Sequence, residues 1–369
     1  MRVTFVMAAA DLTGGCRVIA IYAERLEQRG HEVHLVIRPQ RPFTARERIR
    51  ALVRGEPVGC NRKHSPSHLD PLLGRPGVTI RMIDDYRPIT AAELPDADVV
   101  IATWWETAEW IAKAPPSKGA KAYFIQHYEA LFLGQDPARV DATWRLPMHK
   151  ITIAQWLVDL GRDRFGQTAI TLVPNSVDTQ QFQAMPRGKQ PIPTVGLMYS
   201  DVSFKGCEIG LKAVEIAKQR VPSLRLVAFG NGPRKSSLPL PDDCEYTILP
   251  QQDQIKEIYG RCDAWLLASR SEGNALPLLE AMACRTPVIS TPAGAAPELL
   301  AAGGGVLVPI DDPAAMAREI ERIVSLPEAE WRKISDIAYA TVNQYTWDNA
   351  TDLFEAALQM AVASRQHRG

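Results

Sequence analysis

The first 37 residues contain a strand-like run, a glycine turn, a helical pattern and a second strand-like run in direct succession. Arg2 to Met7 is mostly apolar, and the loop after it carries Gly14 and Gly15. Val18 to Gln28 places apolar residues at helical spacing, and His31 to Ile37 is rich in β-branched residues, which favour strands. A strand–helix–strand unit of this kind joins parallel strands. The pattern therefore predicts a parallel sheet covered by helices.

The alternation of strand-like and helical runs continues along the chain in two series. A stretch from 174 to 193, rich in proline, separates them and has the composition of a linker. We expect two doubly wound α/β domains, 1–173 and 174–346, with a final helix at about 347–369 that crosses back to the first. Ligands of open parallel sheets bind beyond the carboxyl ends of the strands, so both domains should present loops to a central cleft. The remaining predicted strands lie at 98–103, 122–126, 150–154, 170–173, 195–198, 224–229, 244–249, 264–268, 288–290 and 305–308.

The composition excludes several classes of protein. Lys plus Arg is 42 and Asp plus Glu is 42, so the formal net charge is zero and gives no overall attraction to nucleic acid. No apolar run approaches the ~20 residues that cross a bilayer, and no export leader is recognisable, so we expect the protein in the cytoplasm. The six cysteines are scattered and predict neither a disulfide framework nor a zinc site.

Two common nucleotide-binding motifs are missing from the sequence. No G-x-G-x-x-G follows the first strand-like run, and no G-x-x-x-x-G-K-[ST] occurs. A nicotinamide dehydrogenase and a P-loop enzyme are therefore disfavoured. Clusters of Asp and His with metal-ligand spacing are also missing, so we expect neither a resident metal nor another cofactor.

The segment from 269 to 283 carries the sharpest chemical signal. It follows a predicted strand and opens a helix, with Pro277 suited to the first turn. The main-chain amides of 274–276 would point outward at the helix N-terminus, where they form a site for phosphate. Glu272 and Glu280 flank this site, and a carboxylate there accepts hydrogen bonds from sugar hydroxyls. The alternative is that both glutamates only favour the helix dipole.

The eight-residue spacing of Glu272 and Glu280 resembles the Glu-x7-Glu signature of family 4 retaining glycosyltransferases, which have the GT-B fold. Other segments in the same order strengthen the resemblance over most of the chain. They are Gly14-Gly15, Val173-Pro174-Asn175-Ser176-Val177-Asp178, Phe229-Gly230-Asn231-Gly232-Pro233, Pro287-Val288-Ile289 and Tyr345-Thr346-Trp347. The resemblance implies a nucleotide-diphosphate sugar as co-substrate, a donor-binding second domain and an acceptor-side first domain.

The resemblance also implies roles for single residues in the second domain. Glu280 would bind the nucleotide ribose and Glu272 the donor sugar, while Lys205 would hold the diphosphate and stabilise the leaving group. The family usually has an arginine directly after the glycine of the first strand of this domain, but here Leu197 stands there. Either Arg234 or Arg270 supplies the second positive charge, or Lys205 and the helix N-terminus suffice. The implied donor-binding residues are Gly15, Lys205, Arg234, Arg270, Glu272, Gly273, Asn274, Ala275, Leu276 and Glu280.

Three features of the first domain are candidates for contacts with the sugar or the acceptor. His127 follows a predicted strand and resembles a family histidine that approaches the donor sugar; a structural role is the alternative. Trp104 and Trp105 follow another strand, and their rings are either a platform for an acceptor sugar or ordinary packing. The stretch from Arg38 to Lys63 has a local net charge of +6 and includes an amphipathic pattern. It is either a solvated loop or a peripheral contact with anionic lipid at the inner membrane face.

We therefore expect a retaining glycosyltransferase that moves a hexose-type sugar to an acceptor hydroxyl, in cell-surface polysaccharide, lipopolysaccharide or glycolipid synthesis. The acceptor is a sugar, a lipid-linked molecule or a small molecule, and nothing in the sequence resolves UDP, GDP or dTDP as the nucleotide. A GT-B nucleotide-sugar epimerase and a non-catalytic glycosyltransferase-like binding subunit are the alternatives. A phosphorylase is disfavoured, because it would need a pyridoxal-bearing lysine and a longer chain.

Overall fold

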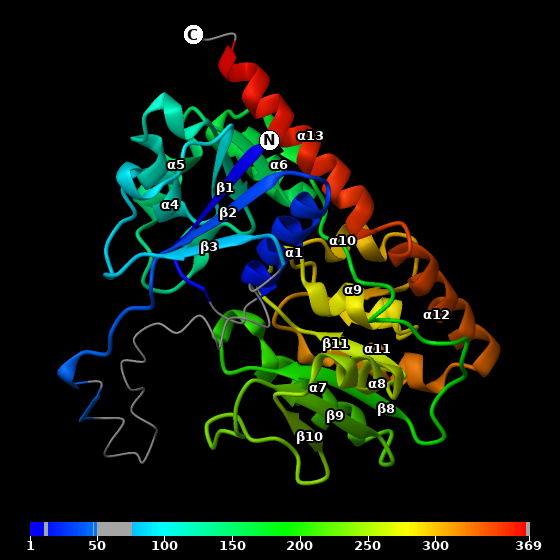
Figure 1. The fold of residues 1–369 in the computed structure, drawn as a ribbon. Helices are drawn as coiled ribbons and strands as arrows, with labels where there is room; N and C mark the ends of the chain where they lie inside the picture. Colours follow the sequence, from blue (N-terminus) through cyan, green and yellow to red (C-terminus); the bar gives the residue numbers. More distant parts are fainter. Residues whose placement is uncertain (11–13, 47, 50–75, 367–369) are drawn as a thin grey trace. The chain divides into compact units, whose positions relative to one another are not determined.

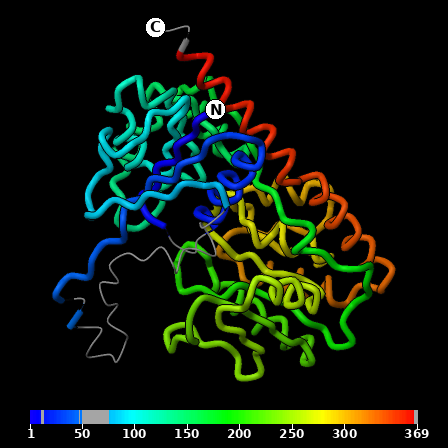
Figure 2. The backbone as a smooth tube through the Cα atoms, viewed as in Figure 1, coloured from blue at the N-terminus to red at the C-terminus, as the bar shows by residue number. Residues whose placement is uncertain are grey.

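The computed structural model describes residues 1–10, 14–46, 48, 49 and 76–366 of the chain. The chain forms two compact units, which Figures 1 and 2 follow from end to end. Unit 1 comprises Met1–Thr152, Leu157–Val173 and Thr351–Gly369. Unit 2 comprises Ile153–Trp156 and Pro174–Ala350.

Unit 1 is built on a parallel sheet in the order β3-β2-β1-β4-β5-β6-β7. At the centre β1 pairs with both β2 and β4, with Val3 opposite Val33 and Val99. From β1 the chain adds strands on one side of the sheet, and from β4 it adds them on the other. The carboxyl ends of β1 and β4 therefore form the switch point, where ligands of such sheets bind. The strands are β1 (Arg2–Met7), β2 (Glu32–Ile37), β3 (Thr79–Met82), β4 (Val99–Ala102), β5 (Ala120–Ile125), β6 (His149–Thr152) and β7 (Ile170–Leu172).

The helices of unit 1 pack on this sheet through apolar and aromatic side chains. Phe354 of α13 stacks on Tyr22 of α1, with ring centroids 4.2 Å apart, and meets Phe124 of β5 edge-on at 5.1 Å. The last part of α13 therefore belongs to the core of unit 1. The helices are α1 (Gly14–Gln28), α4 (Trp105–Ala112), α5 (Pro137–Trp144), α6 (Gln155–Phe165) and α13 (Trp347–Gln366), with short 3-10 turns at Ala91–Glu93, Pro116–Lys118 and Glu129–Leu131.

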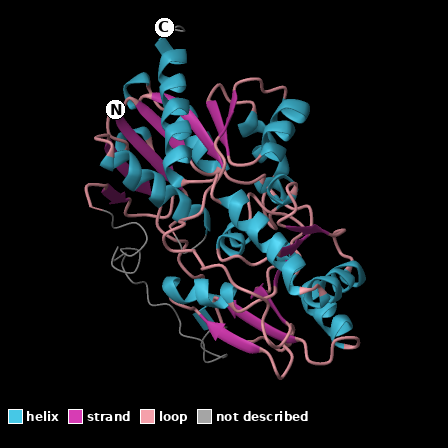
Figure 3. Ribbon diagram, turned by 90° about the vertical axis from the view of Figure 1, so that its right-hand side faces the viewer, coloured by secondary structure: helices cyan, strands magenta, loops and turns pink. Residues whose placement is uncertain are grey.

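Unit 2 repeats the arrangement with a parallel sheet in the order β10-β9-β8-β11-β12-β13, so its switch point lies between β8 and β11. Figure 3 draws the strands in magenta and the helices in cyan. The strands are β8 (Thr194–Tyr199), β9 (Arg225–Gly230), β10 (Glu245–Ile248), β11 (Ala264–Leu267), β12 (Val288–Ser290) and β13 (Gly305–Leu307). The helices are α7 (Cys207–Lys218), α8 (Gln252–Gly260), α9 (Leu276–Ala283), α10 (Ala296–Leu300), α11 (Pro313–Ser325) and α12 (Glu328–Val342), with a 3-10 turn at Ser203–Lys205.

Strand side chains of unit 2 alternate between two apolar clusters, as the two-residue period of a strand requires. Trp265 and Leu267 of β11 join the cluster that also contains side chains of α8, α9, α10 and α12. Ala264 and Leu266 of the same strand join the cluster with α7 and α11. Both faces of the sheet are therefore covered, and the predicted α/β class with two doubly wound sheets is confirmed.

The sequence analysis missed strand β3. Its four residues alternate between exposed and half-buried positions at the edge of the sheet, so they lack the continuous apolar signature of the central strands. The proposed amphipathic helix at 46–54 lies mostly outside the described residues. Of the five cysteines in the described part, Cys207, Cys244, Cys262 and Cys284 are buried and all five are free thiols. No helix in that part is long and apolar enough to cross a bilayer.

Candidate functional site

The loops that follow β8 and β11 meet at the switch point of unit 2 through an ion pair. The Nζ of Lys205 lies 2.9 Å from both Oε1 and Oε2 of Glu272. The hydroxyl of Ser269 donates a hydrogen bond of 2.7 Å to Oε1 of the same carboxylate. The Glu272 side chain is 8% exposed and that of Lys205 is 24% exposed, so the carboxylate is buried while the ammonium reaches the surface. A cation and a carboxylate thus occupy one point beyond the carboxyl ends of adjacent strands.

The turn that carries Lys205 depends on the glycine after it. Gly206 has a φ of +57° and ends the 3-10 turn Ser203–Lys205 while beginning α7. A Cβ at this position would lie 2.1 Å from the carbonyl oxygen of Ala268, which follows β11. Only glycine permits both the left-handed backbone and this close approach. The close packing of the two loops brings Lys205 within reach of Glu272.

Arg270 fastens the same turn from the other loop. Its guanidinium pairs with Glu208 at 2.6 Å and with Asp311 at 2.7 Å, and it also donates to the carbonyl oxygen of Ser203. Its main-chain N–H donates to the carbonyl oxygen of Phe204 at 2.7 Å. Two carboxylates therefore neutralise Arg270 in this structure, and the residue ties the turn that carries Lys205 to β11.

The N-terminus of α9 follows Glu272 after a tight bend. Ala275 precedes the helix with a φ of +70°, a left-handed conformation that is strained for a residue with a Cβ. Within the described residues, the main-chain N–H groups of Asn274, Ala275 and Leu276 donate to no protein acceptor. These amides are the arrangement that binds phosphate at a helix N-terminus.

Neighbouring segments of unit 2 fix the shape of this bend. The indole N–H of Trp156 donates to the carbonyl oxygen of Gly273 at 2.9 Å. The side-chain amide of Asn274 donates to the carbonyl oxygen of Ile153 at 3.2 Å. A Cβ at Gly294, which has a φ of +63°, would lie 2.9 Å from the Cβ of Glu272. The bend is therefore held from two sides.

Glu280 lies one turn into α9 and is almost fully buried. The hydroxyl of Tyr259, from α8, donates a hydrogen bond of 2.8 Å to its Oε2. A buried carboxylate without a hydrogen-bond donor is costly, and Tyr259 supplies one.

Leu197, which stands where the family places an arginine, is buried in the apolar cluster under α7. Together with Lys205, Cys207, Gly210, Ser269 and Glu272 it lines a cavity of about 20 Å³, large enough for one water molecule. Arg234 donates to the carbonyl oxygen of Cys244 at 2.9 Å and lies over the ring of Tyr246. Neither Arg234 nor Arg270 contacts the Lys205–Glu272 pair.

Unit 1 gathers another set of predicted residues beside its own switch point. The side-chain amide of Gln126, directly after β5, donates to the carbonyl oxygen of Gly15 at 3.2 Å. His127 is buried, and its ring lies 4.5 Å from that of Phe132. Trp104 stacks on Phe132 with the two rings nearly parallel and 5.8 Å apart. The partly exposed Trp104 and the buried His127 are therefore joined through one aromatic ring.

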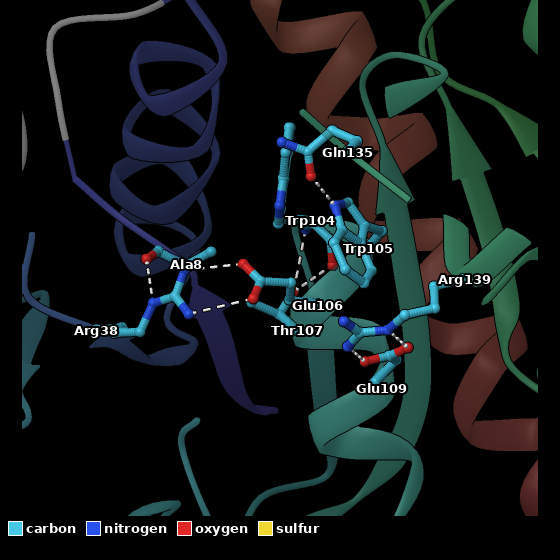
Figure 4. Close-up of polar contacts among 9 residues, drawn as sticks. All are labelled: Ala8, Arg38, Trp104, Trp105, Glu106, Thr107, Glu109, Gln135 and Arg139. Atoms are coloured by element: carbon cyan, nitrogen blue, oxygen red, sulfur yellow. Dashed lines mark hydrogen bonds and ion pairs between the residues drawn. The ribbon is translucent and has the colours of Figure 1, made fainter. Parts of the chain in front are cut away.

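Trp105 does not share this exposure, which corrects its prediction as an acceptor platform. Its side chain is buried, its indole N–H donates to Gln135 at 2.8 Å, and the guanidinium of Arg139 lies 4.6 Å from its ring (Figure 4). Arg139 in turn pairs with Glu109 at 2.6 Å. Trp105 therefore packs inside unit 1, and of the two tryptophans only Trp104 is partly exposed.

Arg38, the first residue of the predicted basic stretch, is also buried. It donates to the carbonyl oxygen of Ala8 at 2.9 Å and pairs with Glu106 at 2.8 Å, as Figure 4 shows. Its guanidinium lies 4.5 Å from the ring of Tyr86. Arg38 thus links β1, β2 and α4 and does not belong to an exposed basic surface. The described basic residues that are exposed in this stretch are Arg41, Arg46 and Arg48, while Arg50, Arg54, Arg62 and Lys63 lie outside the described part of the chain.

Sequence reasoning missed Tyr259, Ser269 and Gln126, each of which holds a predicted site residue. Tyr259 and Gln126 lie far in the sequence from the residues they contact. Ser269 alone of the three lies close to its partner, three residues before Glu272. A hydroxyl close in sequence to a candidate carboxylate was therefore the one signal that could have been used. Among the described residues no group of His, Cys, Asp and Glu is arranged to hold a metal ion.

Part of this chain is similar to known proteins in sequence. Residues 190–325 match the model of the family Glycosyl transferases group 1. A D-inositol 3-phosphate glycosyltransferase of Mycobacterium leprae is 32% identical over 191 residues, which are 45% of this chain and 44% of the relative. The protein of the same name from Mycobacterium tuberculosis strain F11 is 30% identical over 190 residues, 46% of this chain and 39% of the relative. The matched segment spans less than half the length of these curated relatives.

Solved structures match almost the whole chain at low identity. Anabaena HepE, solved in complex with UDP and glucose, has a TM-score of 0.74 and 15% identity and covers 97% of this chain and 99% of its own. Sucrose-phosphate synthase from Thermosynechococcus elongatus has a TM-score of 0.67 and 16% identity and covers 99% of both chains. The chain therefore has the GT-B fold of glycosyltransferases, and its residues 190–325 match the model of the group 1 glycosyl transferases.

Proposed function

We propose that the protein transfers a sugar from a nucleoside-diphosphate donor, bound by unit 2, to an acceptor hydroxyl bound by unit 1. The observation that supports this most directly is the Lys205–Glu272 pair beside the N-terminus of α9. An ammonium and a row of main-chain amides together match a diphosphate, and a carboxylate beside them matches the hydroxyls of the donor sugar. Glu280 binds the ribose.

Chemistry at this site consists of positioning and charge stabilisation. The acceptor oxygen forms a bond to the anomeric carbon while the bond from that carbon to the phosphate oxygen breaks. Lys205 and the amides of 274–276 stabilise the negative charge that develops on the leaving diphosphate. The acceptor attacks from the face that the phosphate leaves, so the configuration at the anomeric carbon is retained, and the leaving phosphate takes the acceptor proton. Gly15 and His127 of unit 1 stay predictions as contacts of the donor sugar.

Lys205 and the helix N-terminus neutralise the diphosphate without a second cation. Leu197 is buried where the family has an arginine, and Arg270 is already paired with two carboxylates. Arg234 bonds to a main-chain carbonyl beside β10. We therefore prefer the simpler of the two possibilities raised by the sequence. Arg234→Ala tests it for Arg234, and Asp311→Asn, which removes one carboxylate partner of Arg270, tests it for Arg270.

On the acceptor side, the accessible ring of Trp104 offers a stacking surface for a sugar or cyclitol ring. The curated relatives are named for D-inositol 3-phosphate, which makes this compound the first acceptor to test. UDP is the first nucleotide to test, because the HepE structure contains it. The exposed Arg41, Arg46 and Arg48, with Phe43 half-exposed beside them, form the described part of a peripheral contact with anionic lipid.

A donor screen tests the proposal. The protein is incubated with UDP-, GDP- and dTDP-sugars, with D-inositol 3-phosphate or a cell extract as acceptor, and released nucleotide is measured. We expect release from one donor class that depends on acceptor. Release of free nucleotide without an acceptor indicates an epimerase, and donor binding without turnover indicates a non-catalytic binding subunit. If no nucleotide sugar is bound or consumed, the transferase function is refuted.

A further inference from the structure

The carboxylate of Glu280 is held in place by a tyrosine from a neighbouring helix. The Tyr259 hydroxyl donates to Oε2 at 2.8 Å, and the Tyr259 side chain is fully buried while Glu280 is 8% exposed. The two residues are 21 positions apart, on α8 and α9, and neither lies in the segment of the other. The contact is therefore a product of the fold and not of a local motif.

Aromatic rings determine where the tyrosine hydroxyl lies. Tyr259 meets Trp265 edge-on at 4.5 Å, Phe229 at 5.9 Å and Phe182 at 6.3 Å. Its main-chain carbonyl accepts a hydrogen bond of 2.7 Å from the hydroxyl of Thr286, which follows α9. A ring packed on several sides leaves the hydroxyl little freedom. Since the packed ring restricts the hydroxyl, the hydrogen bond favours the Glu280 rotamer that accepts it.

We propose that Tyr259 is a positioning residue that orients Glu280, and that this orientation lets the site distinguish a ribose with free hydroxyls from one without them. The inference rests on the proposed function, since it deepens the role of Glu280 as the ribose ligand. A carboxylate that accepts a hydrogen bond from a fixed hydroxyl presents its other oxygen in a set direction. A site built in this way rejects an analogue that lacks the matching hydroxyl, because the buried carboxylate is then left without that partner.

The test compares two nucleotides and does not require turnover. UDP, GDP, ADP and dTDP are titrated calorimetrically into the wild-type protein, and the ribonucleotide that binds most tightly is compared with its 2′,3′-dideoxy counterpart. Tightest binding of dTDP, which already lacks the 2′-hydroxyl, would contradict the inference. We expect the wild type to favour the hydroxylated nucleotide about tenfold or more, the size of a hydrogen bond to a charged group. In Tyr259→Phe, which keeps the ring and removes only the hydroxyl, we expect this ratio to fall to about threefold or less.

A mutant cycle shows whether Tyr259 acts through Glu280. Tyr259→Phe is expected to weaken binding of the hydroxylated nucleotide about fivefold in the wild-type background and to have no further effect in Glu280→Ala. Tyr128→Phe is the matched control, because Tyr128 donates to the carboxylate of Asp141 in unit 1 in the same way. It should leave the ratio unchanged. Thermal unfolding of each variant monitors the fold.

A purely structural role of Tyr259 gives a different result. If Tyr259→Phe weakens both nucleotides equally, or if its effect adds to that of Glu280→Ala, the inference is overturned. Glu280→Asp is a second variant in case Tyr259→Phe does not fold, since the shorter side chain cannot reach both the tyrosine and the ribose. If Glu280→Asp still favours the hydroxylated nucleotide as strongly as the wild type does, the inference is also overturned. If none of the four nucleotides binds to the wild type, the proposed function itself fails.

Discussion

The ammonium of Lys205 lies at the same distance, 2.9 Å, from the two carboxylate oxygens of Glu272. The residue proposed to hold the diphosphate and the residue proposed to hold the sugar are thus paired with each other in this structure. The Glu272 carboxylate is buried and the Lys205 ammonium is partly exposed, so the attraction between them is offset by the cost of removing the charges from water. Its main effect is to hold the two functional groups together before a donor arrives.

Loss of the lysine is expected to weaken donor binding. Lys205→Met keeps the length of the side chain but removes the charge, and we expect the dissociation constant of the nucleotide diphosphate to rise about 10- to 100-fold, the size of one charge-assisted hydrogen bond. Titration calorimetry with UDP measures this. Lys212→Met is the control, because Lys212 pairs with Glu215 on the exposed face of α7. Equal affinities in wild type and Lys205→Met would contradict the assignment.

The two glutamates are expected to fail in different ways. Glu280→Ala should raise the dissociation constant of the nucleotide, because it removes the ribose ligand. Glu272→Ala should leave nucleotide affinity within about threefold and lower turnover about 100-fold or more, because its contacts are to the sugar in the transition state. Binding and steady-state kinetics on the same preparations separate these effects. Unchanged kinetics in both variants would overturn the assignment of the site.

Arg270 is expected to act as a clamp. Arg270→Ala and Asp311→Asn should each lower the free energy of unfolding by about 1 kcal/mol or less, since both side chains are partly exposed. Both should also weaken donor binding a few-fold, because the turn that carries Lys205 is released. Urea unfolding and nucleotide titration measure the two effects. Tighter donor binding in Asp311→Asn would instead show that Arg270 is a phosphate ligand whose charge the aspartate masks.

The adjacent tryptophans offer a matched pair of substitutions. Trp105→Ala should lower the free energy of unfolding by about 3 kcal/mol or more, because it empties a buried site. Trp104→Ala should cost much less stability and raise the KM for the acceptor, because its accessible ring is the proposed stacking surface. Thermal unfolding and acceptor kinetics distinguish the two. An acceptor KM that is unchanged in Trp104→Ala would remove the platform from the proposal.

Glu129 gives a prediction of pH dependence. Burial raises the pKa of this carboxyl from 4.5 to about 8. Between pH 4.5 and about 8 the folded protein keeps the Glu129 proton, which the unfolded chain has lost. The free energy of unfolding is therefore greatest near pH 4.5 and falls as the pH rises to about 8. The slope is at most about 1.4 kcal/mol per pH unit. Glu129→Gln removes this group, so its stability curve between pH 5 and 8 should be flatter than that of the wild type. Parallel curves would contradict the prediction.

The sequence predicts the two parallel sheets because their central strands are continuously apolar and end in glycine or polar turns. It also predicts the Glu272–Glu280 spacing and the helix N-terminus between them, since these lie within one segment. The Lys205–Glu272 pair could not be predicted from residue spacing, because it depends on β8 and β11 being neighbours in the sheet although 64 positions separate Ala264 from Ser200. The bond from Tyr259 to Glu280 depends on helix packing for the same reason.

Local pattern also fails where identical residue types have different surroundings. Trp104 and Trp105 are adjacent, and only the packing of Phe132, Gln135 and Arg139 determines which ring is covered. Arg38 looks like one of several basic residues in a row, but the loop after β2 directs it to Glu106 inside unit 1. The strained conformation of Ala275 is equally invisible, since alanine gives no sign of a positive φ.

Gly206 bears on how this gene can change over time. Every missense change in a glycine codon introduces a residue with a Cβ, and any Cβ at this position would collide with the backbone after β11. All such changes therefore displace the turn that carries Lys205, whatever the chemistry of the new side chain. Mutations of the Gly206 codon are thus expected to cause loss of function, although glycine has no functional group of its own.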